Sequence, residues 1–510
     1  MNLTVLFLLG LCPILWLIVA LIGLKWPTWK AAIGSALVAA LEAMLIWHLS
    51  GMETVTAALE GILMALWPIV LVIIAAVFTY NLCVKTGAMD VIKQMLTNVT
   101  SDRRLLVLLI AWCFGGFMEG MAGFGTAIAI PAGMLAAMGF DPLFSCLVCL
   151  LANGFPTPWG SIGIPTVTLA NLVGLENTAL SFAQSIQAAP FIILIPFIIV
   201  ILAGGKGVKS LKGVWPVALA SGIFFIVPQL IISYFVGAEL AVVVGAVCSM
   251  GITIVMAMKK KADPAYEMDL PESRKITGAQ AFRAWSPFIF IFIFLLCTSK
   301  LVPPVNSWLA QFSSAVQVYS GPDPNTISFV WINTPGVWIF LSAILGAVIQ
   351  KTSAATFFSV LKATVRQMTP TIITMCSVLA TAKIMAYAGM ISDIAAFCIM
   401  VTGSLFTFFA PWLGCLGTFV TGSGTSSGLL FGPVQMDAAE ALGMDPYWVV
   451  GLNMLGVGVG KMLSPQSIAI ALSAVGGAGK DSELLKKVLP YGGILLIFTS
   501  LVGYFGGLFA

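Results

Sequence analysis

Apolar runs of about 20 residues recur along the whole chain, and this is the length of an α-helix that crosses the hydrocarbon core of a membrane. Only 9% of the 510 residues are charged and 60% are hydrophobic, whereas soluble globular proteins carry about 25% charged residues. The strands of an outer-membrane barrel alternate apolar and polar residues, which these runs do not. The sequence therefore predicts an all-α polytopic membrane protein with about 12 to 14 membrane elements.

Lysine and arginine gather at alternate ends of these runs. Basic clusters at 25–30, 85–104, 206–212 and 259–283 mark one side, while the loops 50–61 and 303–329 contain neither residue. Because basic loops stay in the cytoplasm, both chain ends should lie outside, and the hydrophilic stretch 259–285 should be a cytoplasmic linker near anionic headgroups. The expected division is a first membrane half (1–258), this linker (259–285) and a second membrane half (286–510).

Two parts of the chain echo each other at an offset of about 300 residues. GFDP at 139–142 returns as GMDP at 443–446, and NGFPTPWGSIGIP at 153–165 returns as NMLGVGVGKMLSP at 453–465. Each echo follows a glycine-rich interruption, EGMAGFGT at 119–126 or TGSGTSSGLLFG at 421–432. The charge pattern gives the helices before these interruptions opposite directions, so we expect an inverted repeat, as in many secondary transporters.

The glycine-rich interruptions predict helix breaks at the membrane midplane. Unpaired backbone groups there cost several kcal/mol each, so breaks survive only against protein or a water-filled cavity. Glycine permits the turns, and half-helix ends and hydroxyl groups then supply hydrogen-bond donors that suit a small carboxylate. We expect re-entrant or broken helices around 117–131, 154–165, 414–433 and 455–467, which meet at one site. The alternative is that these glycines only let helices pack closely.

Ionisable residues inside apolar segments are rare enough to consider singly. Glu119 is the candidate for proton coupling, unless it is a helix-end carboxylate bonded to nearby backbone. Lys461 is the candidate partner of a substrate carboxylate, unless its side chain reaches the membrane interface. Lys383, Asp393 and Glu42 are interpreted as structural. The expected substrate-binding residues are Gly123, Gly125, Thr126, Asn153, Ser161, Thr421, Ser423, Thr425, Ser426, Ser427, Asn453, Lys461, Ser464 and Gln466.

Common enzyme motifs do not account for these residues. GVGVGKM, at 456–462, lacks the first glycine and the final Ser or Thr of a phosphate-binding loop. A single histidine, His48, excludes an H-E-x-x-H zinc site. The net charge of +4 is too small to indicate nucleic acid. We expect no enzyme activity, no catalytic residue, no cofactor and no metal site; the partners are the lipid bilayer and a small carboxylate, and a monomer and a homodimer both remain open.

The same residues give the chain a resemblance to the lactate permease family. The similarity extends over nearly the whole chain and is strongest at 66–87, 408–427, FGGFMEGMAGFGTAIAI (114–130) and GKMLSPQSIAIALSAVGGAGK (460–480). The resemblance implies proton symport of 2-hydroxy monocarboxylates such as lactate and glycolate across a bacterial inner membrane. It also implies kinship with elevator-type transporters, in which a substrate domain moves against a fixed scaffold.

The chain departs from the family at polar positions of the expected site. Where the family commonly has G-S-D-T-S-S-N, this chain has GSGTSSG, so a carboxylate is absent at Gly424 and an amide at Gly428. Two alternatives within transport therefore stay open: a different organic anion, or coupling to Na⁺. An alternative of another class is a membrane sensor or subunit that binds an anion without moving it.

The expected orientation is testable with introduced cysteines. A cysteine near position 266 should react with a membrane-impermeant reagent only from the cytoplasm, and one near position 317 only from outside, because the basic clusters put these two loops on opposite sides. Equal accessibility of both positions from one side would contradict the assignment.

Overall fold

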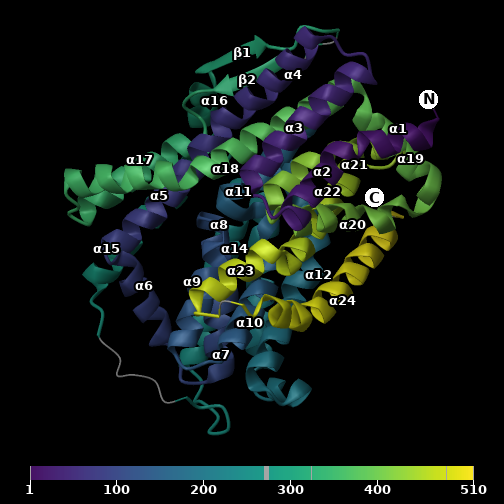
Figure 1. Cartoon of the computed structure of the whole chain (residues 1–510). Helices are drawn as coiled ribbons and strands as arrows, with labels where there is room; N and C mark the ends of the chain where they lie inside the picture. The colour runs from purple at the N-terminus through teal and green to yellow at the C-terminus, as the bar shows by residue number, and fades with distance from the viewer. Residues whose placement is uncertain are drawn as a thin grey trace.

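The computed structural model describes residues 2–123, 125–268, 275–322, 324, 326–477 and 479–508, and these are almost wholly helical (Figure 1). Within these ranges, ten helices are long and apolar enough to cross a membrane, or up to 13 if each of three bent helix pairs is one span. The predicted class, an all-α polytopic membrane protein, is confirmed.

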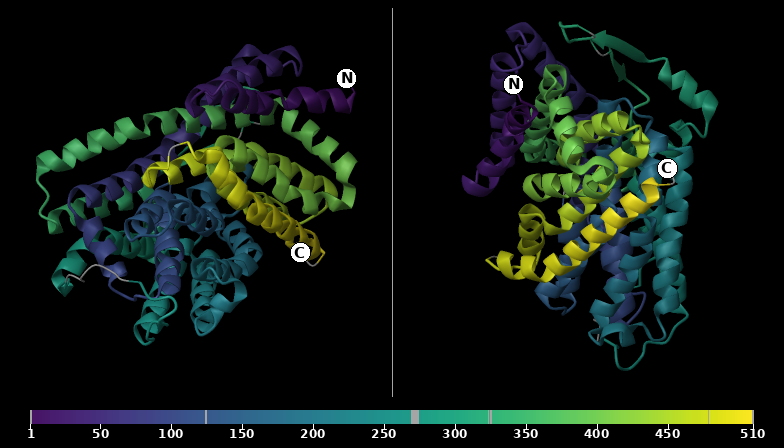
Figure 2. Two further views of the ribbon diagram at one scale, coloured as in Figure 1. Left: turned by 60° about the horizontal axis from the view of Figure 1, so that its bottom comes forward. Right: turned by 90° about the vertical axis from the view of Figure 1, so that its right-hand side faces the viewer.

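One layer of the molecule is built around the long helix α18 (Ala354–Ala388), which packs against α3, α4 and α5. In the left view of Figure 2, this green helix crosses the molecule between the purple N-terminal helices and the blue and yellow ones. We call α3, α4, α5, α15, α17 and α18 the α18 layer. The elements of the N-terminal part are α1 (Leu3–Gly10), α2 (Cys12–Ile18), η1 (Val19–Gly23), α3 (Thr28–Leu45), α4 (Gly51–Met64), η2 (Ala65–Val70), α5 (Leu71–Lys85) and α6 (Ala88–Thr97). Those before α18 in the middle of the chain are α15 (Gly278–Thr298), α16 (Pro303–Ala310), β1 (Ser313–Gln317), β2 (Thr326–Val330) and α17 (Pro335–Ile349).

The other layer, which we call the repeat core, contains two series of elements in the same order. The first series is α7 (Arg103–Val107), η3 (Leu108–Phe114), α8 (Gly115–Met121), α9 (Thr126–Ala137), α10 (Pro142–Gly154), η4 (Thr157–Trp159), α11 (Gly160–Val173) and α12 (Asn177–Gly204). The second is α20 (Phe406–Thr421), α21 (Gly424–Leu442), α22 (Pro446–Leu463), α23 (Pro465–Ala474) and α24 (Asp481–Gly507). The remaining helices are η5 (Gly207–Leu211), α13 (Trp215–Phe235), α14 (Ala238–Met258), α19 (Met390–Thr402) and η6 (Gly403–Leu405).

Helices of the first series pack against helices of the second series within the repeat core. Helix α9 packs against α23, and α11 packs against α21, while α10 and α22 pack against each other. By their place in the series, α9 corresponds to α21 and α11 to α23. The first two contacts are therefore equivalent, which is the pattern that pseudo-twofold symmetry produces.

The GFDP and GMDP motifs have the same structural role: each ends one helix and starts the next. Gly139 and Gly443 have φ angles of 89° and 62°, which end the preceding helices because glycine tolerates the left-handed region. Asp141 then caps α10 by accepting a hydrogen bond from Phe144 N at 2.8 Å. Asp445 caps α22 in the same way, and a proline is the first residue of both helices.

Two sequence expectations about loops need correction. The stretch 50–61 is helical, because Ser50 and Glu53 form a capping box that starts α4 at Gly51. The stretch 303–329 contains α16 and most of an antiparallel hairpin, in which Ser313 of β1 pairs with Val330 of β2. In the linker 259–285, α15 begins at Gly278, and residues 269–274 lie outside the described part of the chain.

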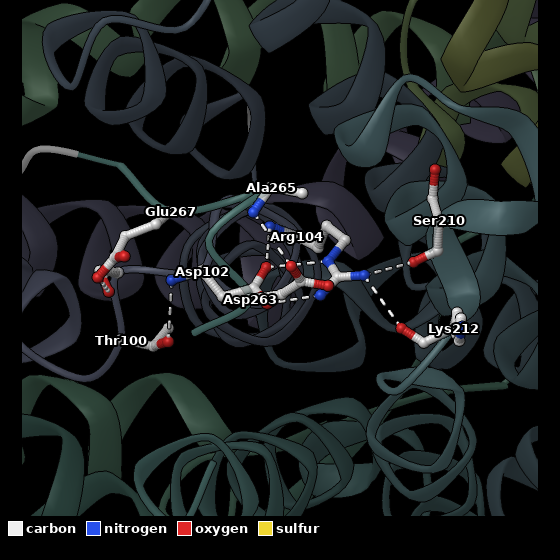
Figure 3. A network of polar contacts seen from close by, with 9 residues as sticks. Thr100, Asp102, Arg104, Ser210, Lys212, Asp263, Ala265 and Glu267 are labelled. Carbon is white, nitrogen blue, oxygen red and sulfur yellow. Dashed lines mark hydrogen bonds and ion pairs between the residues drawn. The ribbon is translucent and has the colours of Figure 1, made fainter. Parts of the chain in front are cut away.

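The start of the linker packs against the repeat core beside a buried ion pair (Figure 3). Asp102 and Arg104 are each 1% exposed and lie 2.7 Å apart, from Asp102 Oδ2 to Arg104 Nη2. Arg104 also donates to the carbonyl of Ser210 at 2.8 Å, and its guanidinium stacks 3.7 Å from the ring centre of Tyr266. This cluster ties the loop before α7, the loop after α12 and the linker together.

Removing one charge of this cluster should destabilise the fold. Asp102→Ala leaves the Arg104 guanidinium buried without its ion partner, which costs about 3–5 kcal/mol. We expect a clearly lower melting temperature of the purified protein in detergent. The control is Asp90→Ala, which removes the exposed pair with Lys93 (3.5 Å) and should change stability by at most about 1 kcal/mol. Equal losses in the two variants would contradict this account.

Candidate functional site

Four breaks interrupt the helices of the repeat core, in the regions where the sequence predicts them. The first lies between α8 and α9, with Gly123 and Gly125 at φ angles of 54° and 87°. The second lies at 155–163, where Ser161, Ile162 and Gly163 are all left-handed. The third is at Gly422 and Ser423, and the fourth at Ser464 alone. Each break belongs to one of the two series, two breaks to a series.

The two breaks of the first series bond to each other. Ser161 donates from its hydroxyl to the carbonyl of Ala122 at 2.8 Å, which satisfies a backbone group at the end of α8. Gly123 must be a glycine here, because a Cβ at that position would lie 2.2 Å from Ser161 Oγ. The close approach of the two breaks therefore depends on the missing side chain.

The breaks of the second series meet in a comparable way, but through a charged side chain. Lys461 Nζ donates to the carbonyl of Gly422 at 2.9 Å, at the C-terminal end of α20. Gln466 follows the last break, and its Oε1 would be only 2.0 Å from a Cβ at Gly422. Gly422 has a φ of 67°, so both its conformation and its crowding require glycine.

The second and third breaks, together with residues that flank the other two, line a cavity of about 700 Å³, which we call the break cavity. Thr157 and Gly424 bring the two series together in its wall, since Thr157 Cγ2 would lie 2.9 Å from a Cβ at Gly424. On one side the cavity reaches the exposed Lys25. Seven of the expected site residues line it: Glu119, Ser161, Thr421, Ser423, Thr425, Lys461 and Gln466.

Glu119 and Lys461 are the two buried charges of the break cavity, at 4% and 7% exposure. Glu119 Oε2 accepts a hydrogen bond from Asn153 Nδ2 at 2.8 Å. A Cβ at Gly160 would lie 2.4 Å from Glu119 Oε1, so Gly160 leaves room for this carboxylate. The ion pairs of the described residues do not include Glu119 with Lys461. Both charges thus face the same space without direct contact.

The hydroxyl run after the third break divides into a cavity face and a packing face. Thr425 lines the cavity, and Ser423 caps α21 by accepting from Ser426 N at 3.2 Å. Ser427 points away and donates to Gly414 O at 2.8 Å. Ser426 is fully buried, and its hydroxyl hydrogen-bonds to no other described residue.

The other expected residues lie behind the cavity wall. Thr126 donates to Gly123 O at 2.7 Å and so closes the first break, together with Gly125. Ser464 caps α23 by accepting from Ser467 N at 3.1 Å. Asn453 is fully buried, and neither polar atom of its side chain has a partner among the described residues.

The break expected around 455–467 is confined to Ser464. Helix α22 continues to Leu463, so Lys461 projects from its last turn. The glycines before it, Gly456 and Gly460, lie inside the helix and would clash with the carbonyls of Pro411 and Cys415 if they carried a Cβ. For these glycines, the alternative of close helix packing is correct.

The sequence interpretation missed two parts of the cavity wall, the residues between 21 and 29 and a stretch of α18. Helix α18 contributes Met368, Thr371, Thr374 and Met375. No glycine-rich break marks this helix, so the pattern that identified the other walls does not apply. The available signal was a pair of threonines one turn apart next to Pro370 in an apolar helix.

Comparison with known proteins gives the family. The sequence pattern of the L-lactate permease family matches residues 6–506. An L-lactate permease of Streptococcus iniae is 41% identical over 442 residues, which are 86% of this chain and 92% of the relative. The glycolate permease GlcA of Escherichia coli (strain K12) is 32% identical over 537 residues, with coverages of 97% and 94%.

A solved structure shares the fold. Neisseria gonorrhoeae MtrF, one of a class of antimetabolite efflux pumps, matches with a TM-score of 0.50 at 15% identity, over 90% of this chain and 85% of that one. With the family match and its candidate spans, the chain belongs to the L-lactate permease family and is a multi-pass protein of the bacterial inner membrane.

Proposed function

We propose that the chain is a secondary transporter, rather than an enzyme, and that it moves 2-hydroxy monocarboxylates such as lactate and glycolate in symport with a proton. The observation that carries the proposal is the break cavity, where one buried lysine and one buried glutamate face the same space beside the helix breaks. The relatives named as lactate and glycolate permeases support the substrate class.

Lys461 is the proposed partner of the substrate carboxylate. Its ammonium has three donors, and one is used on Gly422 O, so two remain for a ligand. Ser423 and Thr425 stand at the N-terminus of the 19-residue helix α21, where hydroxyl and backbone donors favour an anion. Met375 and Ile470 give the cavity an apolar wall for the small hydrocarbon part of the substrate.

Glu119 is the proposed proton carrier. Lys461 and Glu119 balance each other when the cavity is empty, and an arriving carboxylate adds one negative charge to a buried site. A proton on Glu119 restores the balance, because an uncompensated buried charge is costly. Asn153 donates to Glu119 and can keep this hydrogen bond with either protonation state, since a carboxylic acid also has an acceptor oxygen.

The proposal includes the architecture in which this site would operate. The two series of the repeat core would form an inverted repeat that moves against the α18 layer, and the equivalent contacts between the series support it. The distribution of Lys and Arg supports membrane halves 1–258 and 286–510, with the linker 259–285 in the cytoplasm and both ends outside. The break cavity, which reaches Lys25, would then open to the cytoplasm.

Counterflow of labelled lactate in proteoliposomes tests the function. A lactate transporter should exchange external label for internal lactate, and a pH gradient alone should drive accumulation. Exchange of another organic anion only, or accumulation driven by Na⁺ only, would correct the substrate or the coupling ion. An absence of exchange for every small carboxylate would support a sensor or subunit instead.

Removing the proposed carboxylate partner should abolish transport. In Lys461→Ala, the substrate carboxylate loses its cation, at a cost of about 3–5 kcal/mol, so uptake should fall at least about 100-fold. The control is Lys487→Ala on α24, because this lysine is exposed and paired with Glu483 at 3.4 Å. Normal uptake in the Lys461 variant would show that hydroxyl and backbone donors bind the anion without this lysine.

Removing the proposed proton carrier should separate exchange from accumulation. Glu119→Gln retains an oxygen that can accept from Asn153 but cannot bind a proton, so lactate counterflow should persist while accumulation driven by a pH gradient is lost. Glu483→Gln, at an exposed position, is the matched control and should keep both activities. Full accumulation in the Glu119 variant would exclude Glu119 as the proton carrier.

A further inference from the structure

A second cavity, of about 750 Å³, lies farther along the helices that line the break cavity. Helix α18 lines the break cavity with residues between 368 and 375 and the second cavity with residues between 379 and 387. Helices α11 and α21 likewise line both, with their N-terminal residues in the first and their C-terminal residues in the second. Strand β2 contributes to the second cavity, which we call the hairpin cavity.

The two cavities follow one seam between the α18 layer and the repeat core. Met375 lines the break cavity and Leu379 lines the hairpin cavity, and four residues of an α-helix span only about 6 Å. Both residues are nearly fully buried, so they form part of the wall between the cavities. A substrate that leaves the break cavity along this seam would next meet the residues of the hairpin cavity.

The hairpin cavity contains a buried ion pair of the α18 layer. Lys383 Nζ on α18 lies 2.8 Å from Glu60 Oε1 on α4. Tyr387, one turn after the lysine, donates from its hydroxyl toward Glu60, at 2.9 Å from Oε2. The Lys383 side chain is 6% exposed and that of Glu60 is 0% exposed. An anion that enters the cavity therefore contacts the Lys383 ammonium before the Glu60 carboxylate.

The loop between β1 and β2 holds this pair in place. Tyr319 stacks on Tyr387, with ring centres 3.6 Å apart and an angle of 8° between the planes. The next residue, Ser320, donates from its backbone N–H to Thr56 Oγ1 at 3.1 Å, one turn before Glu60 on α4. The pair is thus fixed between α4, α18 and the hairpin. Stability alone does not explain such a pair, since well-packed apolar residues are often as stable as a buried ion pair.

Among the described residues that line the hairpin cavity, Lys383 is the one positively charged residue. Among the described residues that line it, the other charged groups are the carboxylates Glu239 on α14 and Asp437 on α21. Each of these accepts hydrogen bonds from a neighbour: Glu239 from Asn177 Nδ2 at 3.1 Å, and Asp437 from the Ser392 hydroxyl at 2.7 Å.

We propose that the hairpin cavity is a second carboxylate-binding position on the transport path, where Lys383 exchanges Glu60 for the carboxylate of the substrate. This inference rests on the proposed function. A proton from the hairpin side adds to a Glu60 oxygen and ends the ion pair, and the Lys383 ammonium then pairs with the arriving carboxylate. One proton and one anion are taken up together, so the charge of the buried cluster does not change.

The groups around Glu60 are consistent with this exchange. On α18 it faces Lys383 and Tyr387, and behind Tyr387 lies Tyr319. Across the cavity stand the carboxylates Glu239 and Asp437, which make a further negative charge unfavourable and so favour arrival of the anion together with a proton. On the neighbouring helix α3, Glu42 interacts with Cys12 instead.

Substrate protection of a cysteine in the hairpin cavity tests the proposal. Ala386 is exposed and lines this cavity, so Ala386→Cys should react with a membrane-impermeant thiol reagent added from the hairpin side. Lactate should slow the reaction several-fold, and more strongly when the pH on that side is lowered. Gln317→Cys, on β1 and outside the cavity lining, is the matched control and should show no effect of lactate.

Variants of the ion pair separate binding from a structural role. In the Ala386→Cys background, Lys383→Met should remove the protection of the introduced thiol by lactate, whereas Lys383→Arg should retain it. Glu60→Gln combined with Lys383→Met leaves no unpaired charge, so it should fold even if the single variant does not, and it should also lack protection. The same protection in this double variant as in the parent would overturn the proposal. So would an absence of protection in a parent that exchanges lactate normally, whereas a parent without lactate exchange would overturn the proposed function as well.

Discussion

A backbone group without a hydrogen-bond partner in the membrane interior costs several kcal/mol, and the repeat core contains four helix breaks that create such groups. The breaks reduce this cost for one another. In the first series Ser161 donates to Ala122 O, and in the second Lys461 donates to Gly422 O. Ser161 and Lys461, which satisfy broken backbone, therefore also line the cavity. If the cavity binds the ligand as proposed, a change at either residue would affect both ligand binding and the integrity of the breaks.

The two buried lysines differ in what they give up when an anion arrives. Lys461 contacts a carbonyl oxygen and keeps donors free, so an arriving carboxylate adds a charge pair without breaking one. Lys383 is bonded to the carboxylate of Glu60, so an anion gains little there until that partner is neutralised. Under the two proposals, a proton requirement would follow from the geometry of the ion pair in the hairpin cavity, and from the total charge of Lys461 and Glu119 in the break cavity. The two cavities would bind the same neutral combination, a proton plus an anion, by different routes.

The sequence predicted the parts of this arrangement that depend on local chemistry. Glycine and hydroxyl patterns predicted the four breaks, because left-handed turns and helix caps need those residues at those places. It did not predict which side chains meet, since Ser161 and Ala122 lie 39 positions apart and only packing brings them together. Glu60 lies in the stretch 50–61, which the sequence predicts as a loop, and its partner Lys383 on α18 is 323 positions away, so no local pattern joins the two. Contacts between distant helices carry no local pattern.

At Gly424 and Gly428, where the resemblance to the family implies polar residues, the structure leaves little room for a larger side chain. A Cβ at Gly424 would lie 2.9 Å from Thr157 and from Val457, and one at Gly428 would lie 2.9 Å from Met454 Sδ, so neighbouring side chains occupy the space that a larger residue would need. Without a carboxylate at Gly424, Glu119 is the one acidic residue among the described residues that line the break cavity, and two lysines line it as well. Lys25 is exposed, so the buried pair of Lys461 and Glu119 is neutral when Glu119 is ionised and positive when it is protonated. Under the proposed function, proton uptake would therefore strengthen the attraction of the cavity for an anion, which favours the binding of proton and anion together.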